Sequence, residues 1–113
     1  MNFSDTVNEV SRIIARYHER GDMAPSELID AMRLLSTDLA YLETERSNYH
    51  EEWTEEMNRL IGEGESVSGA KIKADLRVPG LYMLRRVMHG ADKVFDAMRS
   101  HLSYLKTEIN QMQ

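Results

Sequence analysis

Apolar side chains recur at alternating steps of three and four residues along two long stretches of this sequence, and that spacing constrains the fold most. In the first stretch the repeated positions are Leu28, Met32, Leu35, Leu39, Leu42, Arg46, Tyr49, Trp53, Met57 and Leu60. In the second stretch they are Leu84, Met88, Ala91, Phe95, Met98, Leu102, Leu105 and Ile109. A repeat of about 3.5 residues is typical of the apolar stripe, or seam, along which the helices of a coiled coil pack. We therefore predict long helices over residues 25–62 and 81–111.

The rest of the chain predicts shorter elements. Residues 4–20 place apolar side chains on one helical face, with Ser4 or Asp5 as the N-cap. Residues 63–80 begin with a run rich in glycine and serine, which predicts a loop that contains a short helix. No stretch alternates as a strand would. The predicted fold is therefore all-α: a single domain with a long antiparallel hairpin of coiled-coil type and a short N-terminal helix.

Side-chain size and charge predict how the two long helices pair. If the numbers of paired positions add to 144, Trp53 faces Ala91, and the largest side chain meets one of the smallest. Residues 43–65 carry eight acids and two arginines, a charge of −6, whereas residues 66–106 carry eight basic residues and three aspartates, a charge of +5. Opposite charges favour the pairing of these two segments, so we predict an antiparallel hairpin in this register.

Composition excludes several classes of protein. The chain has 113 residues, of which 42% are hydrophobic and 29% charged, a balance typical of a folded domain. The net charge of −5 argues against a general DNA-coating protein, whose affinity comes from cations. The absence of cysteine excludes disulfides, thiolate metal ligands and cysteine nucleophiles. No apolar run approaches the ~20 residues of a membrane helix, and the start lacks the features of a signal peptide, which predicts a cytoplasmic protein.

None of the motifs that carry chemistry is complete. The segment 64–71 resembles a phosphate loop, but Ala70 separates the second glycine of the pattern from the lysine. Helical metal sites pair two histidines four residues apart, or a histidine with a glutamate three residues before it, and the four histidines lack both spacings. The glutamates of residues 51–56 are typical of a solvated face rather than of acid–base catalysis. We therefore predict no catalytic, cofactor-binding or metal site, and a protein that is not an enzyme.

Five basic residues surround the start of the last predicted helix: Lys71, Lys73, Arg77, Arg85 and Arg86. One interpretation is a contact surface for an acidic protein partner or for nucleic acid. The other is that these cations balance the acidic first long helix. The second interpretation explains Lys71, Lys73 and Arg77 less well, because the predicted register places them beyond the last core pair.

Apolar residues outside the two seams predict association. They are Ile29, Ile61, Leu81, Met83, Val87 and Val94. The predicted helix over residues 4–20 is too short to cover the hairpin, so these residues would form an unusually large apolar patch on a monomer. A homodimer that forms a four-helix bundle would bury them. We predict that Trp53, Met83 and Val87 contribute to the partner surface.

The segment from Leu39 to Gln113 resembles the small helical-hairpin proteins that tailed phages encode near their replication and recombination genes. The resemblance rests on a charged helix, a loop like Gly64-Glu-Ser-Val-Ser-Gly69-Ala-Lys71-Ile-Lys-Ala74, and a long second helix, and Val78-Pro79-Gly80 departs from it. It implies a phage or prophage origin, a bacterial host cell and a non-enzymatic accessory role. We therefore predict a protein-interaction module, which is an adaptor, an assembly factor or an inhibitor. The alternative is a nucleic-acid-associated accessory protein of a phage replication or recombination module.

Overall fold

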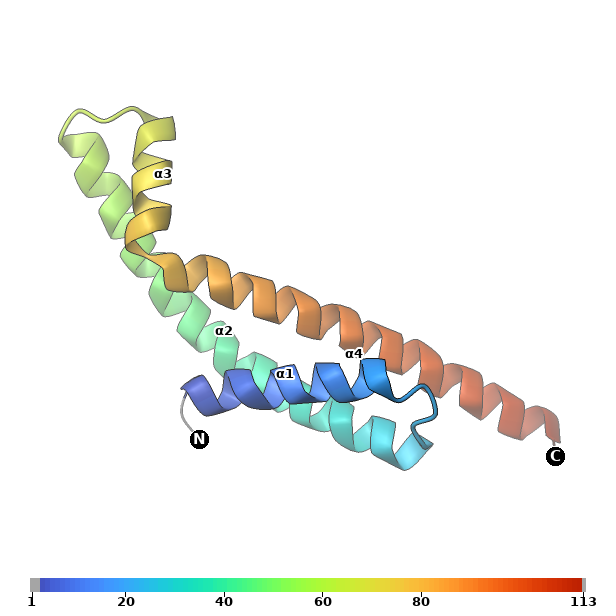
Figure 1. Cartoon of the computed structure of the whole chain (residues 1–113). Coiled ribbons are helices and arrows are strands. Elements are labelled where there is room, and N and C mark those ends of the chain that lie inside the picture. Colours follow the sequence, from blue (N-terminus) through green and yellow to red (C-terminus); the bar gives the residue numbers. More distant parts are fainter. Residues whose placement is uncertain (1–2, 113) are drawn as a thin grey trace.

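The computed structural model describes residues 3–112, and these residues form four helices and no strand. The helices are α1 (Phe3–Glu19), α2 (Pro25–Gly62), α3 (Val67–Arg77) and α4 (Pro79–Met112). Figure 1 shows α4 running alongside the earlier part of α2, with α1 beside them and α3 folded back along the end of α2. The prediction of an all-α fold built from long packed helices is confirmed.

Local chemistry accounts for where the helices begin. Pro25 occupies the first turn of α2, where its missing N–H has no intrahelical partner, and the Glu27 carboxylate accepts a hydrogen bond from the Ala24 N–H at 3.3 Å. Ser66 caps α3, because its hydroxyl accepts a hydrogen bond from the Gly69 N–H at 3.1 Å. The N-cap prediction for α1 is wrong, since Ser4 and Asp5 lie inside its first turn.

A single residue, Val78, separates α3 from α4. Proline disfavours the α conformation of the residue before it, and Val78 accordingly leaves that region, with φ −125° and ψ 64°. The chain bends here and α4 starts at Pro79, so α3 and α4 point in different directions. We call this bend the elbow (Figure 1).

The helices bury two separate apolar clusters. The main core lies between α1, α2 and α4 and is formed by Val10, Met23, Leu28, Ala31, Leu35, Leu42, Leu84, Ala91, Val94, Met98 and Leu102. The smaller core lies between α2 and α3 and is formed by Met57, Leu60, Ala70 and Ala74, with Trp53 half-buried against it. Ala70 and Ala74 are fully buried, and their small side chains allow α3 to pack closely on α2.

The predicted pairing register is wrong. Trp53 packs with Ala70 and Ala74 of α3, and not with Ala91, which belongs to the main core. Tyr49, which the predicted register pairs with Phe95, lies instead against Gly80, where an added Cβ would come within 2.7 Å of the ring. Because α3 occupies the end of α2, α4 pairs with an earlier part of that helix.

The molecule is elongated. Its extents are 69 × 27 × 21 Å and its radius of gyration is 19.0 Å, whereas a compact domain of this length has a radius of about 13 Å. The last turns of α4 extend past the connection between α1 and α2 (Figure 1), and Ile109 is exposed there. A thin bundle of this kind leaves much of each helix in solvent.

Candidate functional site

The most exposed large apolar side chains lie together in sequence around the elbow. Ile72 and Leu76 on α3 are 63% and 75% exposed, and Tyr82 and Met83 on α4 are 67% and 66% exposed. These are the four highest values among the large hydrophobic residues that the structure describes. We call these four residues the elbow surface. An apolar group of this kind marks a site of interaction more often than an isolated exposed leucine does.

An open groove of about 380 Å³ lies within this surface, where α3 meets α4. We call it the first groove, and its lining residues are Asp75, Leu76, Pro79, Leu81, Tyr82, Met83 and Arg85. Most of its lining is apolar, with one carboxylate and one guanidinium. A groove of this composition suits a ligand that presents an apolar side chain next to a polar group.

A second groove of about 370 Å³ lies between the starts of α1 and α4. Phe3 and Val7 line one side, Val87 lines the other, and Tyr49 and Met83 complete it. The rings of Phe3 and Tyr49 meet edge to face, with centroids 6.2 Å apart. Met83 borders both grooves, so the two sites are adjacent along α4.

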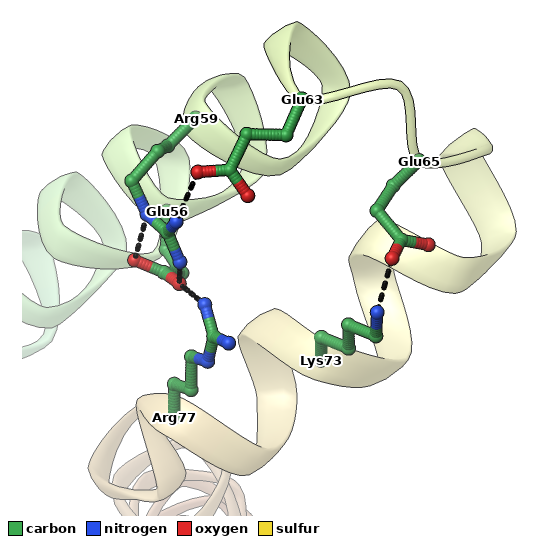
Figure 2. Close-up of polar contacts among 6 residues, drawn as sticks. All are labelled: Glu56, Arg59, Glu63, Glu65, Lys73 and Arg77. Carbon is green, nitrogen blue, oxygen red and sulfur yellow. Dashed lines mark hydrogen bonds and ion pairs between the residues drawn. The ribbon is translucent and has the colours of Figure 1, made fainter.

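Two of the five predicted contact cations are engaged within the molecule. Lys73 forms an ion pair with Glu65, and Arg77 forms one with Glu56 (Figure 2). Glu56 also pairs with Arg59 of its own helix. Balance by the acidic helix therefore does explain Arg77, because α3 folds back beside α2, whereas Lys73 pairs with Glu65 of the loop that joins the two helices.

The other three predicted cations lie in solvent. Lys71, Arg85 and Arg86 are exposed, and within residues 3–112 none of them forms an ion pair or a side-chain hydrogen bond. Arg85 lines the first groove beside Tyr82. The structure thus divides the predicted basic cluster into two internally paired residues and three free ones.

The predicted partner residues occupy different environments. Met83 is exposed and Val87 is half-buried, and both line the second groove. Trp53 is half-buried against the smaller core, and its indole N–H donates a hydrogen bond to Asp75 Oδ1 at 2.9 Å. His50 stacks on the indole with ring centroids 5.9 Å apart. Trp53 is therefore committed to holding α3 on α2, while Met83 remains available to a partner.

Sequence reasoning missed a buried carboxyl group, Asp38. Its exposed fraction is 5%, and its Oδ2 has no hydrogen-bond partner among the described residues. The pKa of Asp38 is raised to about 7. Burial is the largest cause, and a hydrogen bond with Glu9 and the charge of Glu9 add to it. The signal in the sequence was its position three residues after Leu35 and four before Leu42, which places it on the buried face of α2. Asp38 lines neither groove.

Two kinds of feature are absent from residues 3–112. No helix in this part of the chain is long and apolar enough to cross a membrane. The same residues contain no group of three or more histidine, aspartate or glutamate side chains that could hold a metal ion.

Comparisons with protein-family models, curated proteins and solved structures give no match to the chain. The resemblance to phage helical-hairpin proteins therefore stays a prediction.

Proposed function

We propose that this protein is a non-enzymatic interaction module that binds another protein through the elbow surface. The observation that carries the proposal is the high exposure of the elbow surface, since Ile72, Leu76, Tyr82 and Met83 are all more than half exposed and the last three line a groove. Covering such side chains removes apolar surface from water, which is the main favourable contribution to protein association. Tyrosine, methionine and arginine are also enriched at protein interfaces.

The chemistry of the two grooves supports a binding role over catalysis. Asp75 and Arg85 are the only charged side chains among the described residues that line them. Asp75 already accepts a hydrogen bond from Trp53. Acid–base catalysis needs two groups whose surroundings separate their pKa values, and these grooves do not supply such a pair.

The charge distribution favours a protein partner over nucleic acid. Nucleic-acid binding draws its affinity from cations that neutralise phosphates. Here Lys73 and Arg77 pair with Glu65 and Glu56, which leaves a smaller positive surface than the sequence alone suggests. The chain as a whole carries a net charge of −5.

In this proposal the protein is also a homodimer that associates through the end of α4. The heptad seam continues through Leu105 to Ile109, which is exposed where α4 extends past the α1–α2 connection (Figure 1). A seam of this spacing is complementary to a second copy of itself. Leu81 and Val94 do not contribute to the dimer argument, because the single chain already buries both.

A site-specific photocrosslinker tests the proposed surface in the cells that naturally produce the protein. Benzoylphenylalanine replaces Tyr82 in one variant and Tyr104 in a matched control, since both tyrosines are exposed on α4. We expect the variant at position 82 to give a discrete adduct with another protein and the variant at position 104 to give none of that mass. A nucleic-acid adduct at position 82, or identical adducts at both positions, would contradict the proposal.

A further inference from the structure

We infer that the elbow surface accepts an amphipathic helix with an acidic polar face. This inference rests on the proposed function and adds the chemistry of the partner. The relevant features are the two grooves on either side of Met83 and the three free cations Lys71, Arg85 and Arg86.

The arrangement of the grooves favours a helical ligand. Each groove has a volume of about 370 to 380 Å³, and both are lined mainly by apolar side chains. A helix projects residues three and four apart on the same face, about 5–6 Å between their Cβ atoms, so two apolar anchors can enter adjacent grooves. A peptide that binds by strand addition needs the edge of a sheet, and residues 3–112 contain no strand to extend.

Met83 suits the position between the two anchors. It is two-thirds exposed, and its side chain forms part of both grooves. Methionine is unbranched and polarisable, so its side chain can adjust to apolar groups that pack on either side of it. The same residue can therefore contact both anchors of one helix.

The free cations determine the expected charge of the ligand. Arg85 lines the first groove, and Arg86 lies on the same helical face as Tyr82 and Met83, four and three residues further along α4. Arginine binds carboxylates through two parallel hydrogen bonds. By contrast, Lys73 and Arg77 are already paired with glutamates and offer little to a ligand. Carboxylates next to the apolar anchors would therefore meet unpaired guanidinium groups.

The test is a selection from a displayed library of helical peptides against the full-length protein. The library keeps apolar residues at positions i, i+4 and i+7 and randomises the flanking positions equally among acidic, neutral and basic residues. Selected peptides are then synthesised, and their dissociation constants are measured by fluorescence anisotropy. We expect acidic flanking residues to be enriched, and the selected peptides to weaken by about tenfold against Arg85→Glu/Arg86→Glu.

Two variants serve as controls. Lys93→Glu/Lys106→Glu makes the same change in charge at exposed positions of α4 outside both grooves, and we expect dissociation constants within about twofold of the original protein. Met83→Asp introduces a charge between the grooves, and we expect it to abolish binding. Met83 is exposed, so circular dichroism and the thermal midpoint should show that this variant still folds.

The outcomes separate this inference from the proposed function. Peptides that need Met83 but show no acidic enrichment would overturn the acidic-helix inference and leave the interaction surface standing. Binding that Met83→Asp does not affect would overturn both. If Met83→Asp dissociates a protein dimer, the occupant is a second copy of this chain and the inference is overturned. The inference is also overturned if the protein binds a DNA or RNA duplex and Arg85→Glu/Arg86→Glu abolishes that binding.

Discussion

Asp38 is an acidic residue in a position that a hydrophobic residue normally fills. Burial, with the hydrogen bond and charge of Glu9, raises its pKa from the ordinary value of 3.8 to about 7. The folded protein therefore holds this proton to a higher pH than the unfolded chain does. Its contribution to stability is complete below about pH 4 and is lost as the pH rises through 7.

Replacing Asp38 with asparagine should remove this pH dependence. The asparagine amide stays neutral at every pH of the experiment, so we expect Asp38→Asn to raise the free energy of unfolding at pH 8 by about 1–3 kcal/mol and to change it much less at pH 5. Urea denaturation at the two pH values measures the difference. Asp30→Asn, at an exposed position of the same helix, is the control. Parallel pH profiles for Asp38→Asn and the original protein would rule out a buried neutral Asp38.

Trp53 is the only tryptophan of the chain, and it reports on the smaller core. Since the indole is half-buried rather than enclosed, we expect Trp53→Ala to lower the free energy of unfolding by about 2 kcal/mol, less than for a fully buried tryptophan. Trp53→Phe should lose less, because it keeps the packing and loses only the hydrogen bond to Asp75. Chemical denaturation followed by circular dichroism checks the order. A loss of about 4 kcal/mol or more for Trp53→Ala would mean that the indole is more deeply buried.

At the scale of the helices, two glycines of α4 distinguish close packing from open space. A Cβ at Gly80 would come within 2.7 Å of the Tyr49 ring, whereas a Cβ at Gly90 meets its nearest atom, Ile14 Cδ1, at 3.9 Å. We expect Gly80→Ala to destabilise the protein by about 1–3 kcal/mol. Gly90→Ala should stabilise it by about 0.5–1 kcal/mol, because alanine is the better helix former.

A double-mutant cycle tests the cause of the Gly80 effect and, with it, the register of α2 on α4. In a Tyr49→Ala background the ring is absent, so Gly80→Ala should no longer destabilise. Thermal or urea denaturation of the four proteins provides the coupling free energy. If Gly80→Ala costs the same with and without Tyr49, these two residues are not in contact.

The whole molecule is a long, thin bundle, and the end of α4 extends from it. We predict a particle with a mass near twice 13.1 kDa in light scattering at micromolar concentration. Ile109→Asp should convert it to a monomer, because the charge would lie in the seam at the end of α4. Met83→Asp should leave the dimer intact, since the elbow lies at the other end of that helix. A stable 13.1 kDa particle for the unchanged protein would contradict the dimer.

Local sequence was sufficient to predict the helices. Pro25 and the 3–4 spacing of apolar residues act over one or two turns, so α2 spans the predicted residues and α4 begins two residues before its predicted start. The seams also identified buried positions correctly at Leu35, Leu42 and Leu84. These features depend on neighbours within about four residues, which the sequence displays directly.

The register, the packing of α3 on α2 and the state of Asp38 were decided only by the tertiary structure. Tyr49 faces Gly80 instead of Phe95, a displacement of about two heptads, and such a shift leaves both seams facing each other. More than one register of α4 on α2 is therefore compatible with the heptad pattern. The choice is made by contacts between distant segments, above all by Ala70 and Ala74 packing against the end of α2. Pro79 ends α3 at Val78, and the packing of α3 on α2 leaves the apolar side chains of the elbow exposed.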